Sequence, residues 1–145
     1  MTDLWPDLDD GEVEIDIPNP DVNERCLRNV HPTHIHNGVL SSQVFTPSER
    51  DAGKRSTARN SLVSPKEHFE EFKSLGNDSE GVWAVDPTVI QNSDLRWVDD
   101  SESVTNPPAI KGHAYIDFRA PGMSRGKIKR SAREISRAAT RSHPD

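Results

Sequence analysis

The run Gly81-Val82-Trp83-Ala84-Val85, which is closed by Asp86-Pro87, constrains the fold of this chain more than any other stretch. Five consecutive residues without a polar side chain, followed by a proline, predict a strand that is covered on both faces. Such a strand belongs in the interior of a sheet rather than at its edge. The sequence therefore predicts a sheet in which residues 81–86 form a central strand.

Composition limits how much of the chain this sheet can involve. Apolar residues make up 32% of the 145 residues, charged residues make up 29%, and 11 residues are Pro. Globular domains are roughly 45–50% apolar when Gly is counted. We therefore expect one modest core of about 100 to 120 residues. The chain lacks a run of about 18 apolar residues and a charged-then-apolar start, so we expect no membrane span, no secretory signal and a cytoplasmic location.

Charge is distributed unevenly along the chain, although the net charge is only −6. Residues 1–24 carry −9 and contain no Lys or Arg, whereas residues 119–145 carry +6. This asymmetry predicts three parts: an acidic arm (1–24), a domain (25–122) and a basic C-terminal helix with a tail (123–145). The arm is expected to be disordered or ordered by a partner, or to dock as an edge strand through the alternating residues 12–17.

Two helices are predicted with different degrees of amphipathicity. Ser64 and Glu67 form a capping box for a helix over residues 64–76, with Pro65 in its first position. Its buried stripe is expected to consist of Phe69, Phe72 and Leu75, with His68 beside them. Residues 124–141 form the basic helix, with a narrow apolar stripe at helical spacing.

Shorter patterns predict the remaining elements. Pro32 and Gly38 bracket a single helical turn. Residues 48–61 are polar and basic, which indicates a mobile loop. Further strands are expected over residues 27–30, 39–45, 95–98 and 113–118. Together these elements predict an α+β fold, with a small, mostly antiparallel sheet and one or two packed helices.

The last of these strands alternates between apolar and polar residues. Alternate side chains of a strand point to opposite faces, so His113, Tyr115 and Asp117 share one face. This face is either an acid–base site or, in the interpretation we prefer, the polar, solvent-exposed face of an antiparallel sheet.

Several of these segments combine into a recognisable pattern. It consists of R-x-V-H-P at residues 28–32, a Gly at 38, S-Q-x-F-x-P at 42–47 and H-x-x-I-D-F at 113–118. This order resembles a family of small bacterial proteins of unknown function over residues 25–135. The resemblance implies a shared domain and a bacterial or phage origin, and it implies no activity. The acidic N-terminal arm and the basic C-terminus depart from the family pattern.

Residues 25–51 are the first place to look for a site, because they include His31, His34 and His36. In a strand His34 and His36 would share a face, whereas in a helical turn His31 and His34 would do so. The three imidazoles therefore do not converge from one element, and we expect no metal site. The lone Cys26 excludes a cysteine-based zinc site and is typical of a small buried hydrophobic residue. No cofactor is expected.

An alternative hypothesis makes the chain a transferase-like enzyme acting on a nucleotide or RNA. Its candidate catalytic residues are Arg28, His31 and His113, because imidazole suits acid–base chemistry near neutral pH and guanidinium suits phosphate. Arg50 and Lys54 would add positive charge to the same site. The sequence lacks the G-x-S-x-G, P-loop, H-E-x-x-H and G-x-G-x-x-G motifs. The hypothesis requires the three candidates to meet at one concave pocket.

A second alternative assigns nucleic-acid binding to the basic helix. Arg125, Lys129 and Arg133 would neutralise phosphates. No aromatic residue follows Phe118, however, so this helix offers no platform for base stacking.

The interpretation that we prefer is a non-enzymatic accessory protein that acts through a protein partner. Trp5 lies in the acidic arm and is the candidate anchor of a segment that becomes ordered on binding. The arm, the basic helix and a recognition surface within residues 25–51 would form the contacts. The candidate binding residues are Trp5, Arg28, His31, His34, His36, Arg50, Lys54, Arg125, Lys129 and Arg133.

Overall fold

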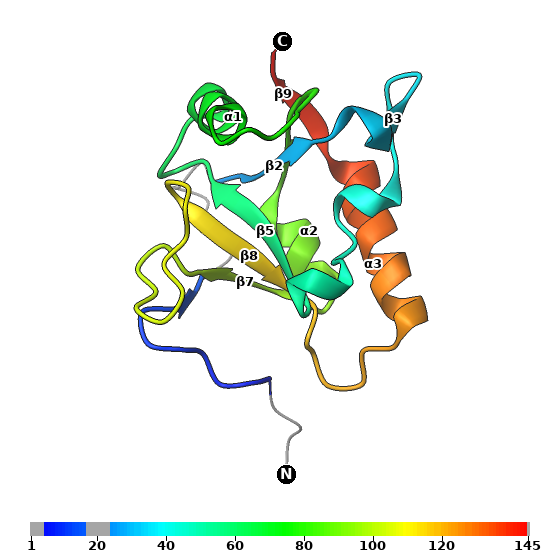
Figure 1. The fold of residues 1–145 in the computed structure, drawn as a ribbon. Coiled ribbons are helices and arrows are strands. Elements are labelled where there is room, and N and C mark those ends of the chain that lie inside the picture. Colours follow the sequence, from blue (N-terminus) through cyan, green and yellow to red (C-terminus); the bar gives the residue numbers. More distant parts are fainter. Residues whose placement is uncertain (1–4, 17–23, 145) are drawn as a thin grey trace.

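A seven-stranded antiparallel sheet forms the centre of the computed structural model, which describes residues 5–16 and 24–144 (Figure 1). In spatial order its strands are β1 (Val13–Glu14), β7 (Arg96–Asp99), β8 (His113–Asp117), β5 (Lys54–Arg59), β2 (Cys26–Val30), β6 (Gly81–Val85) and β9 (Thr140–His143). A separate hairpin is formed by β3 (Ile35–His36) and β4 (Val39–Leu40). The predicted α+β class with a mostly antiparallel sheet is confirmed.

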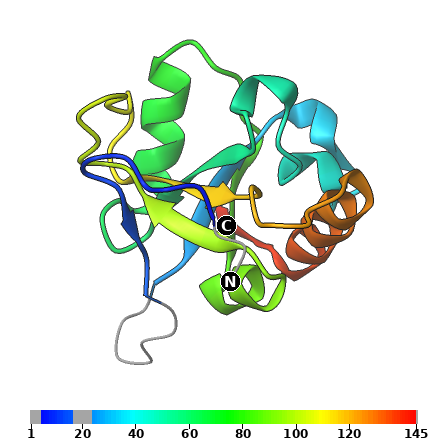
Figure 2. The same cartoon turned by 90° about the horizontal axis from the view of Figure 1, so that it is seen from below.

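Helices cover both faces of this sheet (Figure 2). On one face, α2 (Pro87–Asn92) and α3 (Arg125–Ala138) enclose the larger core, to which Trp97, Ile116 and Ile135 belong. On the other face, α1 (Pro65–Ser74) lies over a smaller cluster that contains Leu27 and Val82. The sheet is therefore the middle layer of three. No helix in the described part of the chain is long and apolar enough to cross a membrane.

Strand β6 is buried along its whole length and lies between β2 and β9, as its apolar sequence predicts. The strands predicted at 27–30, 95–98 and 113–118 are also present as β2, β7 and β8. Sequence patterns did not indicate α2 and β9. In α2 the Asp86 side chain accepts a hydrogen bond from the Thr88 amide, and Pro87 takes the first position.

Both predicted long helices form, although α3 ends at Ala138 rather than at residue 141. The capping box of α1 between Ser64 and Glu67 is present. His68 is buried and Phe69 and Phe72 are partly buried, whereas Leu75, the expected end of the buried stripe, is 52% exposed. Leu75 is the C-cap of α1, beyond the last helical residue.

The prediction of a mobile basic loop over residues 48–61 is wrong. This stretch forms the short 3₁₀ helix η3 (Glu49–Asp51) and then β5, which lies in the middle of the sheet. Two of its cations are paired: Arg55 binds Asp51 at 2.8 Å, and Arg59 binds Glu24 and Asp99 at 2.8 and 2.7 Å. These partners allow a charged sequence to occupy the sheet interior.

The prediction of a strand over residues 39–45 is also wrong beyond Leu40. The chain turns at Asn37-Gly38, where both residues have positive φ angles (53° and 79°), a pair typical of tight hairpins. After β4 it enters the 3₁₀ helix η2 (Ser42–Val44), whose first amides are capped by Ser41. The predicted helical turn is limited to η1 (Pro32–His34).

The described part of the acidic arm lies on the sheet. Strand β1 pairs with β7, and Ile15 is buried in the larger core. Trp5 is partly buried, and the Arg96 guanidinium lies 4.6 Å from the centre of its ring. The arm therefore follows its edge-strand alternative over residues 13–14, while the rest of the predicted arm at 1–4 and 17–23 lies outside the described residues.

The expectation that the polar face of β8 is exposed to solvent is wrong. Tyr115 is 1% exposed and Asp117 is fully buried. Asp117 accepts hydrogen bonds from Arg96 and Arg119, each at 2.8 Å. Burial acts to raise the pKa of Asp117, but these hydrogen bonds outweigh it and hold the pKa below its usual range. This face is therefore a buried ion cluster.

Candidate functional site

The candidate site begins where β2 separates from β5. These strands pair only at Cys26 and Leu27, whereas β2 pairs with β6 at all five positions. The Arg28 side chain lies at this separation and donates from Nη1 to the Ser56 carbonyl oxygen at 2.9 Å. Its Nε is buried and has no hydrogen-bond partner among the residues that the structure describes. Arg28 forms no ion pair with any described residue.

His31 follows directly after β2 and caps η1. Its Nδ1 accepts a hydrogen bond from the Thr33 amide at 3.2 Å and lies 2.8 Å from the Thr33 hydroxyl. Because Nδ1 acts as an acceptor, the neutral ring carries its proton on Nε2. The ring is exposed, so Nε2–H remains available as a donor.

His34 ends the same short helix, and its ring centre is 6.1 Å from that of His31. Burial lowers the pKa of His34, and the positive charges of His31, Arg55 and Arg28 lower it further. The positive potential of these neighbours therefore extends to the His34 ring. His36, by contrast, is exposed on β3, in the hairpin beyond η1.

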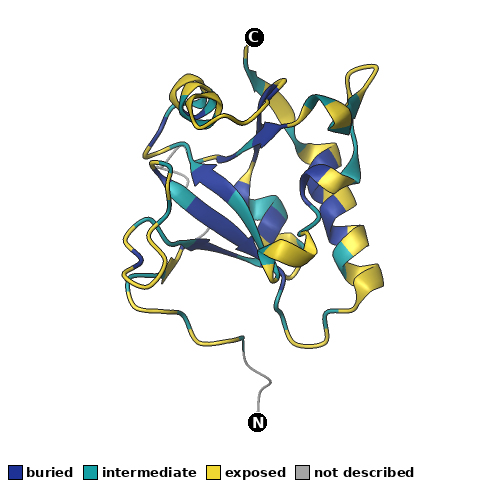
Figure 3. Cartoon of the chain, viewed as in Figure 1, coloured by how far each residue is buried: buried dark blue, intermediate teal, exposed yellow. Residues whose placement is uncertain are grey.

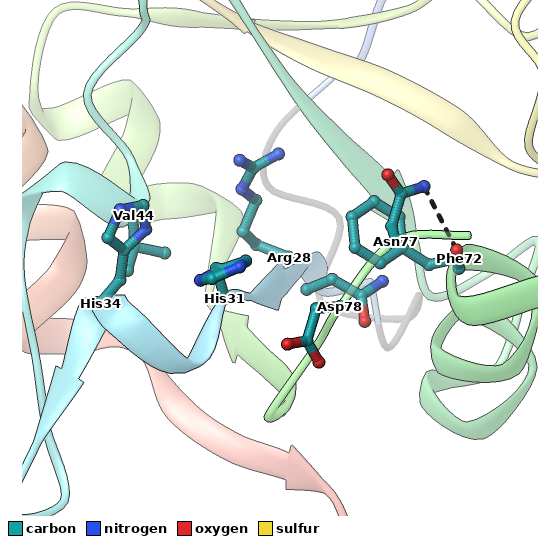
Figure 4. Close-up of a pocket in the computed structure, with 8 residues that line it drawn as sticks. Arg28, His31, His34, Val44, Phe72, Asn77 and Asp78 are labelled. Atoms are coloured by element: carbon teal, nitrogen blue, oxygen red, sulfur yellow. Dashed lines mark hydrogen bonds between the residues drawn. The ribbon is translucent and has the colours of Figure 1, made fainter. Parts of the chain in front are cut away.

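A cavity of about 120 Å³ brings Arg28, His31 and His34 together. Arg28 lies between the two histidines on one side and Asn77 and Phe72 on the other (Figure 4). The complete lining is Arg28, Asn29, His31, His34, Val44, Phe72, Asn77 and Asp78. Sequence reasoning identified the first strand and the histidines but not the α1-side wall at 72–78, because no motif links these residues to the rest.

Burial and the positive charge of Arg55 lower the pKa of Arg28 to about 9. Arg28 is therefore still a cation at neutral pH, in surroundings that disfavour its charge. Asp51 lies in the same neighbourhood but is already bound by Arg55. The cavity thus contains a cation that no carboxylate among residues 5–16 and 24–144 pairs with.

His113 does not reach this cavity. It lies on β8, where its Nδ1 is 2.6 Å from a carboxylate oxygen of Asp100, and it is absent from the lining. The structure therefore places two of the three candidate catalytic residues together and the third elsewhere. Among the described residues, no group of three or more His, Cys, Asp or Glu is arranged to hold a metal ion. Cys26 is fully buried, and burial raises its pKa to about 12, so its thiol remains protonated.

The remaining candidates divide between the sheet and the surface. Arg50 is exposed on η3, and Lys54 lies on β5 with its ammonium 5.2 Å from the centre of the Tyr115 ring. Neither belongs to the lining of the cavity.

Helix α3 presents the other candidate surface. Ser131, Ala132, Ile135 and Ser136 face the core, and the opposite side of the helix is exposed (Figure 3). Arg125, Lys129, Arg133 and Arg137 are all exposed and follow one another at intervals of four residues. This stripe, which we call the basic stripe, spans about 18 Å at 1.5 Å per residue. None of its cations forms an ion pair with a described residue.

The basic stripe weakens the helix that carries it. Like charges four residues apart destabilise a helix by about 0.2–0.5 kcal/mol per pair. The first turn contains no acidic residue, and Arg125 and Lys127 place positive charge at the positive end of the helix dipole. Stability of α3 therefore does not explain this charge pattern.

Comparison with known proteins gives no match to a family model, a curated protein or a solved structure.

Proposed function

We propose that the protein is a non-enzymatic interaction module whose basic stripe on α3 binds an acidic segment of a partner protein. The observation that carries this proposal is the stripe itself: four exposed cations at four-residue intervals, without counter-ions among the described residues. An acidic segment laid along α3 would relieve their mutual repulsion. At physiological salt, charges act over about 8 Å. The stripe can therefore attract an acidic segment nearby, although the rest of the chain is acidic.

Two features favour an acidic protein segment over a nucleic acid. Residues 125–138 carry +5, which leaves −11 for the rest of the chain. A duplex that extends beyond the helix would meet this acidic remainder, whereas a short peptide segment would not. The exposed side of α3 also lacks aromatic side chains on which bases could stack.

The described part of the protein's own acidic arm does not occupy this surface. Strand β1 lies at the β7 edge of the sheet, and α3 packs on a face towards the opposite side (Figure 1). The basic stripe is therefore open to a partner, as far as residues 5–16 and 24–144 are concerned.

Fluorescence anisotropy with a labelled 16-residue poly-glutamate peptide and a labelled 20-base-pair duplex tests this proposal. The peptide is expected to bind the full chain more tightly than the duplex does at 150 mM salt. The charge reversals Arg125→Glu, Lys129→Glu and Arg133→Glu, made together, are expected to weaken peptide binding at least tenfold.

The matched control reverses three exposed lysines near α1, by Lys66→Glu, Lys73→Glu and Lys111→Glu, and so changes net charge equally. This variant is expected to keep peptide affinity within about twofold. If both variants weaken peptide binding equally, the effect comes from net charge, and the basic stripe is not the binding surface. Tighter binding of the duplex would assign α3 to nucleic acid instead.

A further inference from the structure

We propose that the cavity beside Arg28 binds the phosphate group of a small ligand. This site is separate from the basic stripe, and the proposal does not depend on the partner of α3. It follows from the geometry of Arg28, His31 and His34 and from the size of the cavity.

The strongest indication is the state of the Arg28 side chain. Among the described residues, its guanidinium has one hydrogen-bond partner, the Ser56 carbonyl oxygen bound by Nη1, and the buried Nε has no acceptor. A buried donor without a partner is destabilising, and a cation without a counter-ion is more so. An anion in the cavity would supply this counter-charge.

The two histidines add donors from a second element. Capping by Nδ1 leaves Nε2–H of His31 as a donor even when the ring is neutral. His34 lines the same cavity from the other end of η1. The anion would therefore be held between β2 and η1, with the guanidinium fork matching two phosphate oxygens.

The volume of the cavity restricts the ligand. Sites for drug-sized molecules occupy about 300–1,000 Å³, whereas this cavity has about 120 Å³. It therefore accommodates one compact anionic group, with any further part of the ligand outside. Val44 and Phe72 provide apolar walls, which strengthen electrostatic contacts by lowering the local dielectric constant.

The acidic residue nearest to the site does not oppose this assignment. Asp78 belongs to the lining but is exposed at the rim, where water screens its charge. Asp51, the carboxylate that acts on Arg28 from η3, is bound to Arg55. A phosphate also offers more acceptor oxygens than a carboxylate to the donors converging from β2 and η1.

Nuclear magnetic resonance of the full, isotope-labelled chain tests the proposal with inorganic phosphate as the probe, at constant ionic strength. The Arg28 Nε–H signal and the ring signals of His31 and His34 are expected to shift and to saturate together. Arg28→Lys and His34→Ala are each expected to weaken phosphate binding at least tenfold. His34→Ala alters a partly exposed side chain, so it keeps the test valid if Arg28→Lys fails to fold.

The matched control is His36→Ala, because this histidine is near in sequence but outside the cavity. It is expected to change the phosphate dissociation constant less than twofold. Shifts that do not saturate, or that persist in both Arg28→Lys and His34→Ala, would overturn the proposal. Binding of acetate as tight as that of phosphate would also overturn the proposal. Tighter binding of adenosine monophosphate than of phosphate would identify a phosphate monoester as the ligand, and weaker binding would identify free phosphate.

Discussion

His68 is a buried titratable residue on the face of the sheet covered by α1. The residue is 3% exposed, and its Nδ1 has no hydrogen-bond partner within the described part of the chain. Burial lowers its pKa to about 4, and the charges of Arg28 and His113 act in the same direction. An unfolded histidine titrates near 6.5. The neutral ring therefore contributes stability that is present above pH 6.5 and is lost as the pH falls towards 4.

We expect the free energy of unfolding to decrease by about 2 kcal/mol between pH 7 and pH 5 through His68 alone. Urea unfolding followed by tryptophan fluorescence at both pH values measures this change. His68→Leu should remove most of that pH dependence, whatever its effect on stability at pH 7. The exposed His36→Ala variant should retain it. Equal pH dependence in His68→Leu and the wild type would show that this ring is not the titrating group.

Individual residues also show where sequence patterns lose their predictive value. The apolar run at β6 and the capping box of α1 act within a few residues, so they were predicted correctly. Tyr115 and Asp117 have the alternation of a solvent-exposed face, yet Arg96 and Arg119 surround the carboxylate. Arg96 lies 21 residues away in sequence, so the pattern of β8 contains no sign of this partner.

At the scale of elements, β5 shows the same limit. Its sequence KRSTAR has the composition of an exposed loop, but Glu24 and Asp99 neutralise Arg59 from 35 and 40 residues away. The candidate site was likewise predicted only in part. Arg28 and the histidines are close in sequence, whereas the wall formed by α1 and residues 77–78 is brought to them by the sheet.

Strand β9 was expected to be the end of the basic helix and the start of its tail, and its position predicts a measurable role. It pairs with β6 and covers the edge of the most apolar strand. The Arg141 guanidinium lies 5.2 Å from the centre of the Trp83 ring, and the His143 ring lies 5.0 Å from that of Phe69. Edge strands with apolar sequences promote self-association when they are uncovered.

A chain that ends at Ala139 is therefore expected to lose at least about 2 kcal/mol of stability, since each ladder hydrogen bond contributes about 0.5–1.5 kcal/mol. It should also associate through β6. Urea unfolding and light scattering after size-exclusion chromatography measure these effects. A chain that ends at His143 serves as the control. A monomeric Ala139 truncation of unchanged stability would mean that β9 does not protect this edge.

For the molecule as a whole, charge divides the surface into two regions with different roles. The acidic arm supplies an edge strand and a core residue, whereas the basic stripe of α3 makes no ion pair within the described residues. An acidic arm was expected to serve as a partner-binding segment with Trp5 as its anchor. The contact of Trp5 with Arg96 gives the described part of the arm a role in the fold, and its binding of a partner stays a prediction.

Deletion of residues 1–16 tests this role of the arm at the scale of the molecule. It removes β1 and the buried Ile15, and it uncovers Arg96. Burial of an Ile side chain contributes about 1.5–3 kcal/mol, and an exposed cation–π contact adds about 0.5–1 kcal/mol. We expect a loss of about 2–4 kcal/mol in urea unfolding. The affinity of α3 for the poly-glutamate peptide should be unchanged under conditions where the deleted chain remains folded.

The control is the substitution Asp7→Asn, which keeps the strand and the aromatic contact. It should leave stability within about 0.5 kcal/mol. The assignment is wrong if deletion of the arm leaves stability unchanged but alters peptide binding. In that case the arm would take part in binding and would not stabilise the fold.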